Sequence, residues 1–240
     1  SDRLDLASVP ANAKLMRSVR GKDVAMVFQE PMTSLSPVHS IGNQIMEAIR
    51  LHRTKDRKAG RELALDMLSR VGISNPKQRI DEYPHQLSGG MRQRAMIAMA
   101  LSCQPAVLVA DEPTTALDVT VQAQILDLME GLQSEFGMAM LYITHDLGVI
   151  AEIADEVNVM YLGRIVESAA TGQLLDDPKH PYTEALVSAI PVPDPHYDRP
   201  RTEMSGAPRD PIDLGEGCRF RDRCPKVIPP DDLAVEQAAY

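Results

Sequence analysis

Residues 107–113 of the chain are Val-Leu-Val-Ala-Asp-Glu-Pro, an apolar run that ends in two adjacent carboxylates. The run does not alternate apolar and polar side chains, so it predicts a strand of a parallel sheet that is covered on both faces. Open α/β sheets bind ligands at the carboxyl ends of their strands. Asp111 and Glu112 are therefore candidate ligand-binding residues, and the plainer alternative is that they cap the segment that follows.

Other strands and helices alternate around this run. Residues 24–28 predict a short buried strand, residues 138–144 a second buried strand, and residues 157–166 two strands around a turn. Such alternation is typical of an α/β domain with a mainly parallel sheet. Helices are predicted at residues 41–52, 55–71, 91–102, 121–132 and 147–154. A short helix near residue 171 and another that ends at residue 190 precede a Pro-rich stretch.

The charge and composition exclude several classes of protein. The net charge of −9 argues against nucleic acid as the main partner. The apolar runs fall far short of the ~20 residues that a membrane helix needs, so we do not expect the chain to span a membrane by itself. Three cysteines and no visible signal peptide favour the reducing cytoplasm. Because the first residue is Ser, we expect the true start to lie elsewhere.

Residues 87–90, Leu-Ser-Gly-Gly, begin one of the predicted helices. The first backbone N–H groups of a helix have no carbonyl partner, the helix dipole adds partial positive charge, and Gly allows close approach of a phosphate. Ser88, Gly89 and Gly90 are therefore candidate phosphate-binding residues. For these residues alone, a Ser N-cap followed by a flexible turn is the plainer alternative.

Polar side chains also follow the first and third predicted strands. Gln29 ends the first strand and His145 follows the third, so parallel strands would bring both to the sheet edge that holds Asp111. There Asp111 can hold Mg²⁺ through its water shell, Glu112 can polarise an attacking water, and His145 can contact a γ-phosphate. Gln29 can reach Mg²⁺ or water.

The order of these groups along the chain strongly resembles the ABC ATPase family, over almost the whole length. Residues 28–35, 113–120 and 180–186 are similar to the oligopeptide/dipeptide importer branch of that family. The matching motifs are the Q-loop at Gln29, the signature at residues 87–90, Walker B at residues 107–111, the catalytic glutamate at Glu112, the D-loop at residues 116–118 with Asp118, and the switch histidine at His145.

The resemblance implies a fold and its division into parts. The fold is a P-loop NTPase-like α/β ABC ATPase core with a mainly parallel sheet, a helical subdomain and a C-terminal extension. The core takes residues 1–36, with the Q-loop, and residues 86–170, with the other motifs. The helical subdomain takes residues 37–85 and the peptide-importer-type extension residues 171–240.

The resemblance also implies that the chain is an ATPase, with ATP and Mg²⁺ as cofactors, that drives import of di- or oligopeptides. Such subunits work in head-to-tail pairs, with each ATP between Walker A of one subunit and the signature of the other. The resemblance implies that Glu112 is the general base and that His145 stabilises the developing charge. It implies that Gln29 and Asp111 bind Mg²⁺, and that Gln29, Asp111 and Asp118 bind the nucleotide. Ser88, Gly89 and Gly90 would bind the ATP held by the partner subunit.

The implied partners are a second ABC ATPase subunit, identical or homologous, two transmembrane permeases and an external solute-binding protein, with no nucleic acid. By the same resemblance, the permeases would contact residues 37–83. The subunit would be peripheral, on the cytoplasmic face of the cell membrane.

One family motif is not found, the Walker A loop G-x-x-x-x-G-K-[ST]. Gly21 and Lys22 do not supply it, because Met16 stands where the first Gly is needed and Asp23 replaces the Ser or Thr. The resemblance implies that the loop precedes Ser1. A sheet without that strand and helix is expected to have unpaired edges and an uncovered apolar face.

Three alternatives stay open at this point. The first alternative is a non-catalytic coupling subunit that completes a partner's ATP site. The second is an importer ATPase for another solute, such as nickel or a peptide-like compound. An ABC ATPase of translation or DNA repair is the third, and residues 180–186, the single signature and the acidic charge speak against it.

The cysteines raise the question of an iron–sulfur cluster, because the family tail often carries four. Cys218 and Cys224 match two of those positions, but Asp231 stands at a third. Two thiolates do not hold a four-iron cluster, so none is expected. We expect Cys103 to be a buried helix residue, and the two tail thiols to pack a small turn around Phe220.

Overall fold

The computed structural model describes residues 5–30, 34–115, 117–190, 202, 204, 206–210, 212 and 217–226. The chain divides into two compact units, Ser1–His145 and Asp146–Tyr240. The expectations for residues 31–33, Ala116, the Pro-rich stretch from residue 191 and Asp231 fall wholly or partly outside the described residues.

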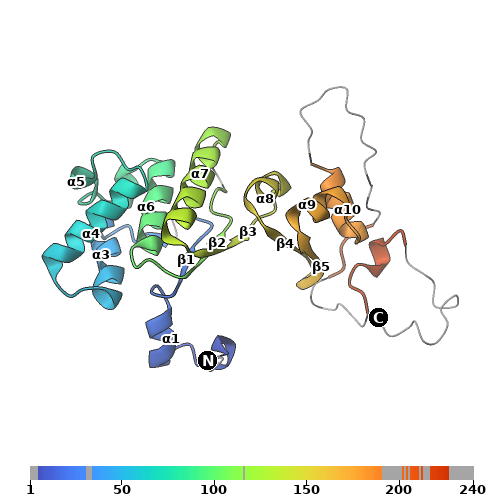
Figure 1. The fold of residues 1–240 in the computed structure, drawn as a ribbon, viewed down its shortest axis with the longest axis horizontal. Helices are drawn as coiled ribbons and strands as arrows, with labels where there is room; N and C mark the ends of the chain where they lie inside the picture. The colour runs from blue at the N-terminus through green and yellow to red at the C-terminus, as the bar shows by residue number, and fades with distance from the viewer. Residues whose placement is uncertain are drawn as a thin grey trace. The chain divides into compact units, whose positions relative to one another are not determined.

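The first unit is built on a parallel sheet of three described strands, in the order β1-β2-β3 (Figure 1). The strands are β1 (Val24–Val27), β2 (Val107–Asp111) and β3 (Ala139–Ile143). Val24 lies opposite Val107, and Asp111 lies opposite Ile143. All three strands therefore end at one edge of the sheet, which confirms the α/β prediction and positions the polar residues that follow them.

Helices pack against this sheet and against one another. In the described part, α6 packs on β1, and α3, α4 and α6 pack together in one apolar core (Figure 1). Helix α3 begins after Ser40, whose hydroxyl accepts a hydrogen bond from the backbone N–H of Asn43 at 3.4 Å. The helices are α1 (Lys14–Val19), α3 (Ile41–His52), α4 (Arg57–Arg70), α5 (Pro76–Arg79), α6 (Gly89–Leu101) and α7 (Val119–Phe136), with 3₁₀ turns at Leu6–Ser8 and Pro84–Gln86.

The sequence prediction for β3 is right about the strand and wrong about its burial. Strand β2 is central, and Leu108 and Ala110 are fully buried. Strand β3 lies at the edge of the described sheet, and Leu141 and Ile143 are 54% and 45% exposed. Apolar side chains of β3 are thus uncovered among the described residues. The burial prediction failed because an apolar run indicates the propensity for a strand and not whether another element covers it.

Close backbone packing between α3 and Ile80 gives a test of the helical part. The backbone N–H of Gly42 donates to the carbonyl of Ile80 at 2.7 Å, and a Cβ at Gly42 would lie 2.3 Å from Ile80 Cγ1 and 2.7 Å from the Ile80 oxygen. We expect Gly42→Ala to lower the free energy of unfolding by about 1–3 kcal/mol, as overpacking does. Urea denaturation of the full-length subunit measures it.

Gly131→Ala on α7 is the matched control, since a Cβ at Gly131 would meet nothing within 4 Å. Helix propensity alone predicts that this variant is stabilised by up to about 1 kcal/mol. Equal changes in unfolding free energy for the two variants would contradict the close approach of Ile80.

The second unit contains an antiparallel pair of strands, β4 (Glu156–Tyr161) and β5 (Arg164–Ala170). Helices α8 (Leu147–Ile153), α9 (Thr171–Asp176) and α10 (Pro181–Ser188) accompany the pair. Its apolar core contains Val157, Val159, Leu174 and Val187.

The tail turn near Arg221–Arg223, a 3₁₀ helix, differs from the prediction made for its cysteines. Phe220 is 1% exposed and packs on the rings of Tyr161 and Tyr182, with centroids 5.1 and 5.7 Å away. The prediction that both tail thiols pack around Phe220 is wrong, because Cys218 is exposed and Cys224 partly so. The aromatic rings fill that space instead.

Cys103 is buried as expected, but it lies two residues beyond the end of α6. Its thiol donates to the carbonyl of Ala48 at 3.5 Å, and burial raises its pKa. Across the described residues, no helix combines the length and the apolar character that a membrane span requires.

Candidate functional site

Glu112 lies directly after β2, at the sheet edge where the three strands end. Its backbone N–H donates to the carbonyl of Ile143 at 2.9 Å, so its main chain still pairs with β3. Its φ of +42° then turns the chain away from the sheet. Non-Gly residues in this left-handed region are uncommon and concentrate at functional sites.

Three side chains donate hydrogen bonds to the Glu112 carboxylate. Gln29 Nε2 and Thr115 Oγ1 contact Oε2 at 2.8 and 2.9 Å, and His145 Nδ1 contacts Oε1 at 2.9 Å. Gln29 follows β1 and His145 follows β3, so the parallel sheet itself brings them to Glu112. The structure thus unites three residues that the sequence predicted separately.

The same hydrogen bonds set the charge of Glu112. The bond from His145 holds the pKa of the Glu112 carboxyl below its ordinary value, and the Thr115 hydroxyl acts in the same direction. An ionised carboxylate only accepts hydrogen bonds, so Nδ1 of His145 carries the proton in this contact. Glu112 is therefore ionised near neutral pH, as a group that takes a proton from water must be.

A residue of α6 forms a hydrogen bond with the loop that follows Glu112. Gln93 is 1% exposed, and its Nε2 donates to the carbonyl of Pro113. A buried amide that loses such a bond leaves an unsatisfied group, which is costly. Gln93 thereby links the helix that begins at Ser88 to the loop that holds Glu112.

Ser88 is the N-cap of α6, and its hydroxyl accepts from the backbone N–H of Met91 at 3.3 Å. Gly89 and Gly90 are the first two residues of the helix, so their N–H groups precede any intrahelical carbonyl partner. A Cβ at Gly89 would meet nothing within 4 Å, so its backbone is open to approach. The capping role and the predicted phosphate role are compatible at this helix start.

Asp118 caps the neighbouring helix, α7. Its Oδ1 accepts from the backbone N–H of Val121 at 3.0 Å. A Cβ at Gly90 would lie 3.0 Å from Val121 Cγ1, so the starts of α6 and α7 lie against each other. Ser88, Gly89, Gly90 and Asp118 thus form a second group at two helix starts, beside the group around Glu112.

The residues predicted to hold Mg²⁺ offer suitable atoms. Asp111 ends β2 and supplies a carboxylate, and Gln29 supplies its amide oxygen, since its Nε2 is directed at Glu112. Mg²⁺ prefers such oxygen ligands and usually takes the rest from water and substrate phosphates. In the described part of the chain, no group of three or more His, Cys, Asp and Glu could hold a metal ion by itself.

Two residues of the site were missed by sequence reasoning, Thr115 and Gln93. Thr115 carries a visible signal, a hydroxyl three residues after a candidate carboxylate, at the separation of a tight turn. Gln93 has no such signal in the sequence, because a polar residue between two arginines is normally expected on the surface.

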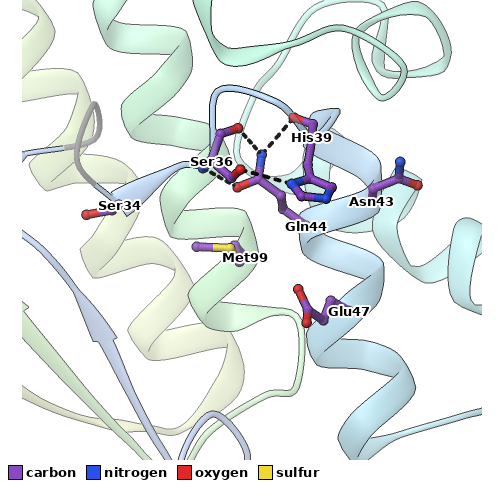
Figure 2. A pocket seen from close by; sticks show the side chains of 7 residues that line it. All are labelled: Ser34, Ser36, His39, Asn43, Gln44, Glu47 and Met99. Atoms are coloured by element: carbon purple, nitrogen blue, oxygen red, sulfur yellow. Dashed lines mark hydrogen bonds between the residues drawn. The ribbon is translucent and has the colours of Figure 1, made fainter.

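A separate cavity of ≈ 270 Å³ lies between the loop before α3, α3 itself and α6 (Figure 2). Gln44 organises its rim: its Nε2 donates to the carbonyls of Ser36 and His39 at 3.1 and 2.9 Å, and its Oε1 accepts from the Ser36 N–H at 2.7 Å. Glu47 and Met99 also line it. The cavity is lined by other residues than the Glu112 group.

Two family models match the chain. The model of the ABC transporter family matches residues 3–115. The model described as oligopeptide/dipeptide transporter, C-terminal region, matches residues 166–229. The first match contains Gln29, Glu112 and Thr115.

Curated relatives and solved structures agree with these matches. A Brucella melitensis protein described as a candidate peptide import ATP-binding protein is 52% identical over 98% of this chain and 71% of its own length. The oligopeptide transport ATP-binding protein AppD of Bacillus subtilis is 53% identical, over 88% of this chain and 64% of its own length. A dimeric ATP-binding cassette in a post-hydrolysis state, bound to ADP and Pi, has a TM-score of 0.58 at 26% identity, and covers 70% of this chain and 68% of its own.

Proposed function

The chain belongs to the ATP-binding family of ABC transporters, and we propose that it acts in an importer subunit that hydrolyses ATP to move di- or oligopeptides across the membrane. The observation that carries the ATPase part is the ionised Glu112 carboxylate, held at the sheet edge by Gln29, Thr115 and His145. The names of the relatives and the match of residues 166–229 support peptides as the solute.

The chemistry proposed for this site is attack of water on the γ-phosphate of ATP. A proton of the water passes to Glu112, the water oxygen bonds to the γ-phosphorus, and the bond to the bridging oxygen breaks with its electron pair going to ADP. His145, across from the carboxylate, stabilises the charge that develops. Asp111 and Gln29 would hold Mg²⁺, which would supply positive charge to the phosphate oxygens.

We further propose that the subunit works in a head-to-tail pair. The helix start at Ser88, Gly89 and Gly90 then serves the ATP of the other subunit, and the open space at Gly89 supports the approach of a phosphate there. The other proposed partners are two permeases and an external solute-binding protein, at the cytoplasmic face of the membrane.

The permeases would contact residues 37–83, and the cavity rimmed by Ser36, His39 and Gln44 supports this placement. It opens beside α3, it is polar at its rim, and it is built from groups whose hydrogen bonds fix its shape. A helix or loop end of a permease that presents a donor to Glu47 would fit such a cavity.

Uptake in vesicles tests the proposed function. Right-side-out membrane vesicles carrying the full-length subunit and its permeases are loaded with ATP, and are given the binding protein and a radiolabelled tripeptide from outside. We expect ATP-dependent accumulation of the peptide, lost on replacing Glu112 by Gln, because hydrolysis needs the base.

Labelled Ni²⁺ and free amino acids serve as competing solutes in the same vesicles. ATP-dependent uptake of Ni²⁺ without uptake of peptides would contradict the peptide assignment. Peptide uptake that survives Glu112→Gln in this subunit would instead favour a non-catalytic coupling subunit.

A further inference from the structure

Thr115 makes two hydrogen bonds to the residue that we propose as general base. Its side-chain Oγ1 donates to Glu112 Oε2 at 2.9 Å, and its backbone N–H donates to the Glu112 carbonyl at 3.1 Å. The two bonds close a four-residue turn whose ends are fixed by main chain and side chain together. A hydroxyl placed in this way restricts the rotamer of the carboxylate.

Thr115 differs from the other two donors in where it lies. Gln29 and His145 reach Glu112 from the ends of other strands, so their bonds depend on how those strands and loops are placed. Thr115 belongs to the same loop as Glu112. The Thr115 bond to Oε2 therefore does not depend on the position of another strand end.

The backbone that presents the hydroxyl is itself held in place. Glu112 bonds through its N–H to Ile143 at 2.9 Å, and the carbonyl of Pro113 accepts from the buried amide of Gln93. The loop is thus attached to β3 on one side and to α6 on the other. A donor on such a loop keeps its direction without being reorganised during the reaction.

We propose that Thr115 is a positioning residue that orients Glu112 so that Oε1 takes the proton from the attacking water. Among the described residues, Oε2 accepts two hydrogen bonds and Oε1 accepts one, so Oε1 has lone-pair capacity left for a water. This inference rests on the proposed function, and it adds a residue and an atom to it.

The test compares Thr115→Val with Thr115→Ser in the full-length transporter complex. Valine keeps the branched shape without the hydroxyl, and serine keeps the hydroxyl. Hydrogen bonds to charged groups are strong, so we expect kcat for ATP hydrolysis to fall by about 10- to 100-fold in Thr115→Val, with KM little changed. Thr115→Ser should restore most of kcat.

Thr114→Val is the matched control for folding, since it makes the same change one residue earlier, at a buried position. Its kcat should stay close to that of the unchanged complex. Thermal denaturation of each variant shows whether it is folded, and Thr115→Ala serves as a second hydroxyl-free variant if Thr115→Val is not.

The comparison with serine gives a readout that a merely structural role would not move. Valine and serine differ in the hydroxyl that donates to Glu112. A loss confined to kcat, with KM unchanged and with recovery in Thr115→Ser, therefore assigns the effect to this hydrogen bond.

Each outcome separates this inference from the proposed function. A folded Thr115→Val complex with unchanged kcat would overturn the role of Thr115, while loss of turnover in Glu112→Gln would leave the base in place. A serine variant as slow as the valine variant would also overturn it. Absence of ATP hydrolysis by the unchanged complex would overturn the proposed function, and this inference with it.

Discussion

Replacement of Glu112 by Gln is expected to lower kcat for ATP hydrolysis by about 10²–10⁴-fold while ATP binding is retained. The amide is nearly isosteric with the carboxylate, so it still fits between Gln29, Thr115 and His145. It cannot take a proton from water at neutral pH. The loss should therefore fall on the chemical step and not on the affinity for ATP.

Steady-state hydrolysis and equilibrium binding of a labelled nucleotide to the full-length complex measure the two quantities. Glu130→Gln, at an exposed position of α7, is the matched control and should change neither. Near-normal turnover in Glu112→Gln would remove Glu112 from the role of base. Loss of nucleotide binding would show instead that its charge serves the binding site.

The prediction for Glu112 could be made from the sequence because the information is local. A continuous apolar run predicts a strand, and the residue that follows a strand lies at the edge where the strand ends. The same reasoning placed Gln29 and His145, and the parallel register of the described strands confirms it. Elements with strong local patterns, such as α3 and α4, were predicted to within two residues at either end.

The details that the sequence did not predict depend on contacts between distant segments. The exposure of Leu141 and Ile143 depends on what covers β3, which its own residues do not encode. The burial of Gln93 depends on the carbonyl of Pro113, twenty residues away. Phe220 is buried by Tyr161 and Tyr182, so its surroundings could not be predicted from the two cysteines near it in sequence.

At the helix start at Ser88, two interpretations of the sequence are compatible with the structure. The hydroxyl caps α6, as the plainer alternative expected, and the N–H groups of Gly89 and Gly90 remain at the helix start. Gly90 has a second reason to lack a side chain, because Val121 of α7 lies against it. The role of this helix start in a partner's site therefore has to be tested by function.

Ser88→Arg is expected to reduce ATP turnover of the pair to near background while nucleotide binding at the subunit's own site persists. A long cationic side chain at the N-cap would fill the space in front of the Gly89 and Gly90 amides, where we propose that the partner's γ-phosphate lies. The substitution also removes the Ser88 cap, which costs about 0.5–2 kcal/mol of stability. Ser88→Ala removes the cap without the bulk, so it is the control for that loss and should retain more turnover.

A mixed pair of ATPase subunits provides the sharpest form of this test, since two defects can be divided between the subunits or combined in one. If the signature acts on the partner's ATP, Ser88→Arg in one subunit and the Glu112→Gln change in the other both damage a single site and leave the second site complete. Combining both changes in one subunit damages both sites, so turnover should be lower there than in the divided pair. The opposite order of turnover would show that Ser88 serves its own subunit's ATP, and would overturn the head-to-tail arrangement proposed here.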